Sequence, residues 1–175
     1  LVAEKGVQTL LAAVRPLRAA HPGLRVVLAG TGGHEAELRA QARRLRIARS
    51  LEWLGFVPAA ELPALFGAAD VAVVPSFYEP FGIVALEAAV AGVPLVVAET
   101  GGLADLAARG IAAASFPAGD VDELVTAVGK VLIDPAAARQ HARRSARIVA
   151  RDYTWPAVAR QTVAAYERAV SPTSR

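Results

Sequence analysis

Two glutamates, Glu79 and Glu87, flank a short apolar segment, EPFGIVALE, whose spacing suits ligand chemistry. Pro80 restricts Glu79 to an extended backbone, so the helix that follows begins no earlier than Phe81. The first N–H groups of a helix have no partners within the helix, and together with the helix dipole they attract phosphate. Carboxylates beside them can accept hydrogen bonds from ligand hydroxyls. The segment therefore predicts a site for a molecule that carries both phosphate and hydroxyl groups.

The backbone N–H groups predicted to meet the phosphate are those of Gly82, Ile83 and Val84, and Gly82 lacks a side chain where the ligand would approach. Glu87 is the only charged residue of the helix expected at 81–91. A helix that is apolar all round is typically buried, and a buried carboxylate is costly unless it is paired or hydrogen-bonded. We therefore expect Glu87 close to the core, facing a cleft. The alternative is an internal salt bridge, with Lys5 or an arginine.

The elements that position these residues alternate between short β-branched runs and longer helical stretches. Strands are expected at 25–29, 51–54, 71–74, 94–98 and 112–116. Helices are expected at 6–20, 34–46, 59–69, 81–91, 103–108, 121–133, 136–151 and 156–170, with a frayed tail at 171–175. This order predicts an α/β fold in which a Rossmann-like parallel sheet carries helices on both faces, as one domain over residues 1–175. Ligands of such sheets bind at the carboxyl ends of the strands.

Composition excludes several kinds of site. The chain has no cysteine, which rules out disulfides, cysteine zinc sites and thiol nucleophiles, and its three separated histidines argue against a metal site. No apolar run reaches the ~20 residues that span a bilayer. Arginines gather at 43–49 and 142–151, which we interpret as solvated helix faces. A nucleic-acid surface needs more concentrated charge with interleaved aromatics, so no nucleic-acid partner is expected.

The sequence resembles the retaining GT-B glycosyltransferases known as glycosyl transferases group 1, which include sucrose synthases, mannosyltransferases and bacterial glycogen synthases. The resemblance rests on the paired glutamates within PSFYEPFGIVALEAAVAGVPLVV (75–97). Further matching motifs occur in the expected order: EKG (4–6), AGTGG (29–33), LGFVP (54–58), TGGLAD (100–105) and YTW (153–155). Together they cover nearly the whole chain as the C-terminal half of a GT-B fold.

The resemblance implies two catalytic side chains. Glu79 would bind hydroxyls of the transferred sugar. Lys5 would contact the diphosphate and offset the negative charge that develops on the leaving group. Glu87 would hold the ribose hydroxyls, while Val84 would pack beside the nucleoside. The alternative interpretation of Lys5 is that it is a solvated lysine at a helix start without a ligand role.

The resemblance also implies the rest of the pocket. Phe81, Gly82 and Ile83 would present backbone N–H groups to sugar and phosphate. The base would lie near Phe56 and Val57. Further contacts are expected from Gly32, Ser76 and the turn Gly101-Gly102. The simpler alternative for Gly32 is a strand-to-helix turn without a ligand role.

The implied activity is that of a retaining hexosyltransferase with a UDP-, GDP- or ADP-sugar as donor and no metal or cofactor. The first residue is Leu1 and methionine is absent, so we expect the chain to be a fragment. The resemblance implies that it lacks a first strand and an N-terminal domain that holds the acceptor. Alone it would have little or no activity. A cytoplasmic location is expected, with peripheral membrane association open for the full-length protein. The alternatives are a non-catalytic nucleotide-sugar-binding module, and a GT-B relative such as an epimerase or phosphorylase.

Overall fold

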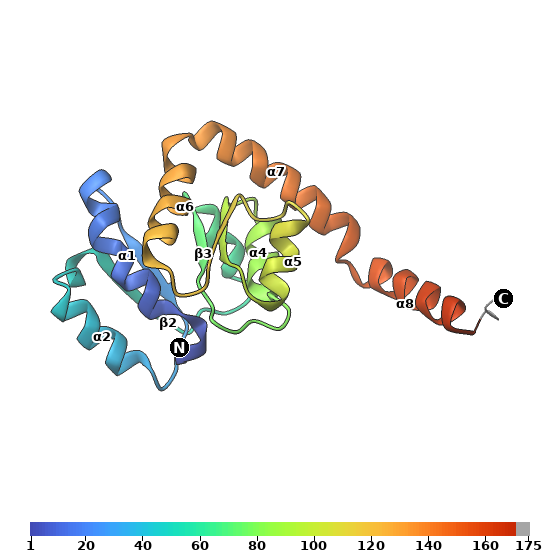
Figure 1. Ribbon diagram of the computed structural model, residues 1–175, viewed down its shortest axis with the longest axis horizontal. Helices are drawn as coiled ribbons and strands as arrows, with labels where there is room; N and C mark the ends of the chain where they lie inside the picture. The colour runs from blue at the N-terminus through green and yellow to red at the C-terminus, as the bar shows by residue number, and fades with distance from the viewer. Residues whose placement is uncertain (171–175) are drawn as a thin grey trace.

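Short parallel strands lie between helices in the computed structural model, which describes residues 1–170 (Figure 1). The strands are β1 Val26–Ala29, β2 Leu51–Gly55, β3 Ala72–Val74, β4 Leu95–Ala98 and β5 Ala114–Phe116. The α-helices are α1 Val7–Ala20, α2 Glu35–Arg44, α3 Leu62–Gly67, α4 Ile83–Val90, α5 Gly101–Ala108, α6 Val121–Ile133, α7 Pro135–Asp152 and α8 Trp155–Val170. Two 3-10 helices, η1 Ala3–Lys5 and η2 Ala48–Ser50, complete the order. The predicted order of elements is confirmed; the expected frayed tail lies outside the described residues.

Strand β4 is buried on both of its faces, as expected for a strand in the middle of a parallel sheet. Its residues Leu95 and Val97 pack into a cluster with residues of α4, α5 and α7. Its residues Val96 and Ala98 pack into a second cluster with residues of α1, α2 and α6. The two clusters show that helices cover both faces of the sheet at this strand.

The predicted α/β fold of parallel strands flanked by helices is confirmed, but the strands form two sets, and the coverage is less complete at β1 and β2. These two strands pair in parallel with each other, whereas β3, β4 and β5 form a separate parallel set. In β1, Leu28 is buried in the core but the neighbouring Val27 is 44% exposed. Successive side chains of a strand point to opposite faces. An apolar sequence therefore did not reveal that one face of β1 is only partly covered.

Helix starts in the C-terminal part follow from capping side chains. Asp120 accepts a hydrogen bond from the Glu123 N–H at 3.0 Å, which sets the first turn of α6. Asp134 does the same for α7 with the Ala137 N–H, also at 3.0 Å. A capping carboxylate satisfies one of the N–H groups that a helix start leaves open. The predicted bounds of α6 agree with the structure for this reason.

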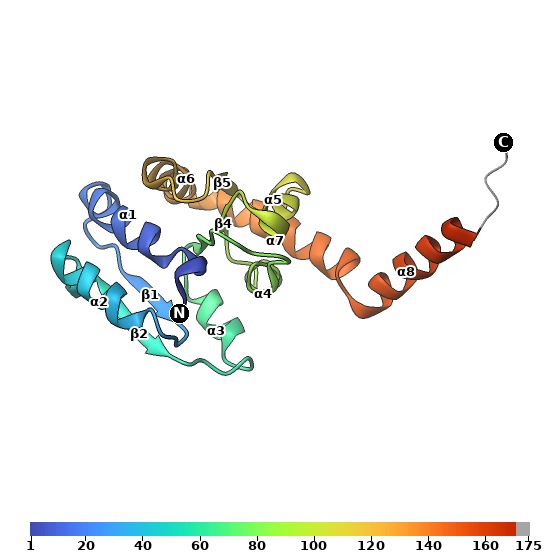
Figure 2. The same ribbon diagram turned by 60° about the horizontal axis from the view of Figure 1, so that its bottom comes forward.

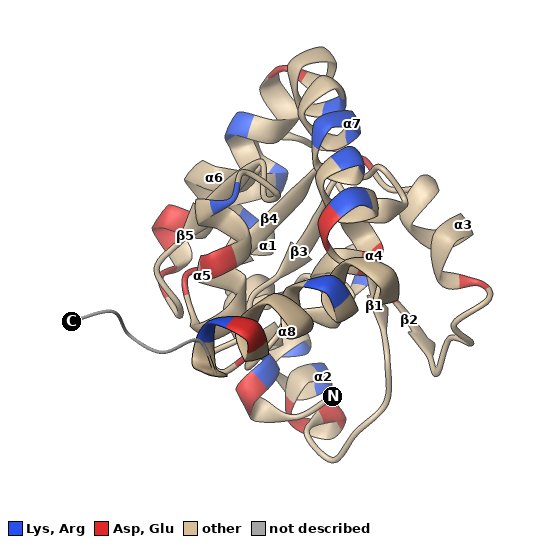
Figure 3. Ribbon diagram, turned by 90° about the vertical axis from the view of Figure 1, so that its right-hand side faces the viewer, with Lys and Arg blue, Asp and Glu red and all other residues tan. Residues whose placement is uncertain are grey.

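Helix α7 carries the second arginine-rich run on its surface, where basic residues follow one another along the helix (Figure 3). Arg143, Arg144 and Arg147 are exposed, while Ser145 is buried on the opposite side. The Ser145 hydroxyl donates a hydrogen bond to the Ile111 carbonyl at 2.8 Å and thereby fixes the helix to the body. The expected solvated face is confirmed for this run.

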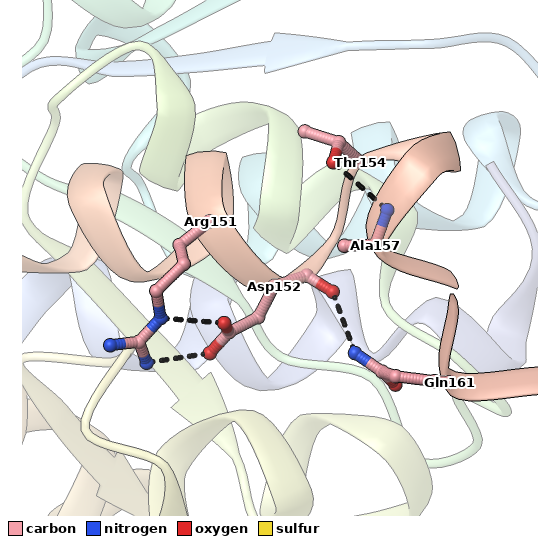
Figure 4. A network of polar contacts seen from close by, with 5 residues as sticks. All are labelled: Arg151, Asp152, Thr154, Ala157 and Gln161. Atoms are coloured by element: carbon pink, nitrogen blue, oxygen red, sulfur yellow. Dashed lines mark hydrogen bonds and ion pairs between the residues drawn. The ribbon is translucent and has the colours of Figure 1, made fainter. Parts of the chain in front are cut away.

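Helix α8 extends away from the rest of the molecule (Figures 1 and 2). At its junction with α7, the Arg151 guanidinium holds the Asp152 carboxylate at 2.6 and 2.8 Å (Figure 4). This hydrogen-bonded pair lowers the pKa of Asp152. Only Ala157 is buried within α8, and Trp155 and Tyr166 are exposed. In residues 1–170 no helix has both the length and the apolar character needed to cross a bilayer.

The fold is expected to lose stability in mild acid through His141. Burial lowers the pKa of His141 below its usual 6.5, and Arg144 lowers it further. At a pH between the two pKa values, His141 is protonated in the unfolded chain but not in the folded one. The free energy of unfolding is therefore highest above about pH 6.5 and decreases as the pH falls towards the pKa of the folded state. Urea unfolding at pH 7.5 and 5.5 should show a smaller loss in His141→Gln than in the wild type. An equal loss in both proteins would contradict this role.

Candidate functional site

Lys5 and Glu79, the two predicted catalytic residues, are in direct contact. The Lys5 ammonium lies 2.6 Å from Oε2 of the Glu79 carboxylate, although the two residues are 74 positions apart in sequence. The Lys5 side chain is 48% exposed and that of Glu79 is 13% exposed, so the pair lies at the surface with the carboxylate largely covered. Lys5 is therefore neither a free solvated lysine nor a partner of Glu87.

Gly6 lets Lys5 approach the end of β3. It adopts φ +65°, and a Cβ at this position would overlap the Pro75 carbonyl oxygen. The backbone N–H groups of Phe77 and Tyr78 donate to the Glu4 carbonyl at 2.8 and 3.3 Å. These contacts join η1 to the loop that carries Glu79. The sequence did not single out the carbonyl of Glu4, because a backbone contact leaves no signature in the side chain.

The start of α5 fixes the other side of the same loop. The Gly102 N–H donates to the Glu79 carbonyl at 2.9 Å, and the Thr100 hydroxyl donates to the Phe77 carbonyl at 3.0 Å. A Cβ on Gly101 would overlap the Glu79 carbonyl oxygen. The predicted turn at Gly101-Gly102 forms the first residues of α5, where a Cβ on Gly102 would likewise overlap the backbone of Phe81. Thr100 is a positioning residue that the prediction missed.

The start of α4 faces the Glu79 carboxylate. Gly82 caps the helix with φ +87°, and its N–H lies 3.3 Å from Oε1 of Glu79. No hydrogen bond within residues 1–170 occupies the N–H groups of Ile83 and Val84. The carboxylate thus holds both Lys5 and the Gly82 N–H, while two further donors stay open at the helix start. Such donors suit a phosphate.

Glu87 is exposed, so the prediction that it lies close to the core is wrong. The buried face of α4 is made of Ala85, Ala88 and Ala89. Ile83, Val84 and Glu87 are exposed together on the other face, where residues three and four apart are neighbours. Within residues 1–170 Glu87 takes part in no ion pair. An apolar helix composition here reflects an uncovered apolar surface beside the predicted phosphate site, not complete burial.

Phe56 and Val57 line an open depression of about 490 Å³ between the end of β2 and α3. Phe56 is 76% exposed, so a flat aromatic surface is available to a ligand there. This volume lies in the range of small-molecule sites. Gly32 follows β1 at the same end of the two strands, and a Cβ on it would overlap the backbone of Leu1. Packing thus accounts for Gly32, and its ligand role stays a prediction.

Ser76 lies where β3 meets the Glu79 loop. It is 1% exposed, and its hydroxyl has no hydrogen-bond partner within the described residues. An unsatisfied buried hydroxyl costs stability, which is consistent with a polar group held for a ligand. Phe81 is exposed beside Gly82. Among residues 1–170, no group of three His, Asp or Glu side chains is arranged to hold a metal ion.

The comparisons with known proteins agree on the family. The model of the family described as "Glycosyl transferases group 1" matches residues 1–149. Glycogen synthase of Mycobacterium tuberculosis is 44% identical over 163 residues, which are 93% of this chain and 39% of that protein. An uncharacterized glycosyltransferase of Methanocaldococcus jannaschii is 33% identical over the whole chain and 45% of its own length. The chain thus spans less than half of these curated relatives.

Solved structures show the same fold. Sucrose-phosphate synthase of Thermosynechococcus elongatus superposes with a TM-score of 0.82 at 30% identity, over 95% of this chain and 43% of that one. The Anabaena protein HepE, solved in complex with UDP-glucose, gives a TM-score of 0.83 at 25% identity, over 96% of this chain and 46% of HepE. These matches identify the parallel strands and their helices as part of a GT-B glycosyltransferase. The chain belongs to the glycosyl transferases group 1.

Proposed function

We propose that the full-length protein is a retaining glycosyltransferase that uses a nucleoside diphosphate sugar, and that Lys5 and Glu79 act on the donor. The observation that carries the proposal is the Lys5–Glu79 pair, at 2.6 Å, beside the open N–H groups of α4. This arrangement offers a cation and backbone donors to a diphosphate, and a carboxylate to sugar hydroxyls. The HepE complexes with UDP and UDP-glucose support a donor of this class.

In the proposed complex the diphosphate binds at the start of α4 and the sugar lies against Glu79. The phosphate accepts hydrogen bonds from the N–H groups of Ile83 and Val84, and from that of Gly82 once Glu79 turns to the sugar. Lys5 stays between the carboxylate and the phosphate. Negative charge grows on the leaving diphosphate as the glycosidic bond breaks, and a positioned ammonium stabilises that charge. Lys5 thus supplies the positive charge that a metal ion could otherwise provide. We propose that the reaction uses no metal or cofactor.

The nucleoside is proposed to lie between the exposed face of α4 and the depression at Phe56. Glu87 would accept hydrogen bonds from the ribose hydroxyls, and Val84 would pack against the nucleoside. Titration calorimetry with UDP, GDP and ADP, each with and without its sugar, identifies the base. Absence of binding for all three nucleotides, in a folded protein, would refute the donor site.

Glu87→Ala is expected to weaken binding of the preferred nucleotide about 10- to 100-fold. A hydrogen bond to a charged group contributes about 1.5–3 kcal/mol, which corresponds to that range. Because Glu87 is exposed and has no ion pair among the described residues, the variant should unfold at nearly the wild-type temperature. Asp70→Ala is the matched control, since Asp70 is an exposed carboxylate that precedes β3 at the opposite end of the strand. Equal affinity in wild type and Glu87→Ala would remove the ribose role.

The acceptor is proposed to bind a second domain that faces this one across the site. Two observations support this: the chain spans 39% of the glycogen synthase it matches, and α8 exposes Trp155 and Tyr166 as apolar surface for another part of the protein. The chain alone would then have little transferase activity. We also propose that the full-length protein is located in the cytoplasm and associates peripherally with a membrane. NMR of the product's anomeric carbon tests retention, and an inverted product would refute it.

A further inference from the structure

An open depression of about 620 Å³ lies where the C-terminal ends of α1 and α2 meet. Four arginines line it, namely Arg15, Arg18, Arg44 and Arg46, together with the buried Ile47. We call this feature the arginine pocket. It includes part of the arginine run at 43–49, so this run is more than a solvated helix face. The two helix ends lie on the side of the molecule far from α8 (Figures 1 and 2).

The four guanidinium groups lack compensating charge. No carboxylate lines the pocket, and no ion pair within residues 1–170 involves any of the four arginines. Another arginine of α2 does have a partner, since Arg39 pairs with Glu35 at 2.8 Å. Positive charges that share one concave surface repel one another and raise the local potential for an anion. The electrostatic potential of the pocket therefore favours a ligand with several negative charges.

Helix dipoles account for only part of this arrangement. Arg18 and Arg44 lie in the last turns of α1 and α2, where a cation interacts favourably with the free carbonyl groups. Arg15 lies one turn earlier, and Arg46 lies beyond the end of α2. The dipole falls off within the last turn, so it does not account for Arg15.

Arg46 occupies a backbone conformation that usually belongs to glycine. Its φ is +57°, and it is the only non-glycine residue with positive φ in residues 1–170. The turn that ends α2 is closed by hydrogen bonds from Ile47 to Ala42 at 3.1 Å and from Arg46 to Arg43 at 3.0 Å. In this type of helix end the left-handed residue is most often glycine. A non-glycine residue in this conformation is uncommon, which makes Arg46 a candidate for a functional role.

We propose that the arginine pocket binds a small organic phosphate with at least two negative charges, at a site separate from the donor site. Guanidinium groups match phosphate oxygens in pairs, and the volume is that of a small-molecule site. None of the residues that line the pocket is an exposed large apolar residue, so nothing there would insert into a lipid surface. Helix α1 begins beside Lys5, and its rise from Val7 to Arg18 is about 16 Å, which separates the two sites.

The test is titration calorimetry of pyrophosphate into the full-length protein that carries Lys5→Ala, a change that weakens anion binding at the donor site. We expect binding to persist in this background. Arg46→Gly and Arg15→Gln, added separately, should each lower the affinity about 10-fold or more. Arg46→Gly relieves the backbone strain, so its unfolding temperature should not fall. Loss of binding without loss of stability separates a ligand site from a structural role.

Arg143→Gln is the matched control, because Arg143 is an exposed arginine of α7 outside the pocket. Its affinity for pyrophosphate should stay within twofold of the parent protein. An equal loss in Arg143→Gln and Arg46→Gly would show a general effect of charge and overturn the proposal. So would binding to phosphatidylglycerol vesicles or to a single-stranded oligonucleotide without binding of pyrophosphate. Failure of the donor site alone would remove nucleotide-sugar binding and leave the pyrophosphate result unchanged.

Discussion

Lys5→Ala is expected to lower the rate of sugar transfer by the full-length protein about 100- to 1000-fold. Removal of one positioned group that stabilises transition-state charge typically costs this much in kcat. Lys5 is held 2.6 Å from Glu79, so its ammonium is already in place when charge develops on the leaving group. KM should change less than kcat, because the N–H groups of Ile83 and Val84 still bind the phosphate in the ground state. Steady-state kinetics with a saturating acceptor measures both constants.

Lys130→Ala provides the control for Lys5→Ala, because Lys130 is exposed on α6 and has no ion pair within residues 1–170. This variant should transfer sugar at the wild-type rate. Both proteins should also unfold near the wild-type temperature, since the half-exposed Lys5 contributes little net stability through its ion pair. If kcat of Lys5→Ala fell less than tenfold in a folded protein, the leaving-group role would be wrong.

Gly6→Ala is expected to lower the free energy of unfolding by about 2–5 kcal/mol. A left-handed backbone costs an alanine roughly 1–2 kcal/mol. Overpacking adds about 1–3 kcal/mol, and here the added methyl group would meet the Pro75 carbonyl, which cannot move away without shifting β3. The loss should appear as a lower denaturant midpoint in urea unfolding. Because Gly6 also sets the position of Lys5, donor binding should weaken in whatever protein remains folded.

Gly129→Ala is the matched control for Gly6→Ala. Gly129 lies within α6, and a Cβ there would meet nothing within 4 Å. Alanine is the better helix former, so this variant should be more stable than the wild type by about 0.5–1 kcal/mol. The same chemical change should thus have opposite signs at the two glycines. A Gly6→Ala protein within 1 kcal/mol of the wild type would show that η1 and β3 do not need this close approach.

Local signals made much of the fold predictable. The bounds of α6 follow from a capping aspartate and a helical pattern of apolar residues, both of which are visible in the sequence. Strand β4 consists of apolar residues throughout and is buried on both faces, as its composition predicts. The direct contact between Lys5 and Glu79 was not predicted, because the family resemblance implied only that both residues bind the same donor.

Tertiary contacts account for what the sequence did not reveal. Glu87 is exposed because it lies on the same uncovered face of α4 as the exposed apolar residues beside it. Composition alone does not distinguish a buried helix from a helix with an exposed apolar face. Gly101 has no room for a side chain because the backbone of the loop that carries Glu79 lies against it. The arginine pocket depends on two helix ends that are 26 residues apart in sequence, Arg18 and Arg44. None of these three features can be predicted from the residues that are adjacent in sequence.

Helix α8 is expected to be less stable than the body of the fold, because the core clusters include none of its residues. An isolated helix of about 15 residues is marginal in water, and α8 buries only Ala157 against the rest of the chain. Its amide hydrogens should therefore exchange with deuterium long before those of β4, whose opening requires the whole core to unfold. Contact with another part of the protein would slow that exchange. If the proposed second domain contacts α8, the exchange rate in α8 will report that contact without any substrate.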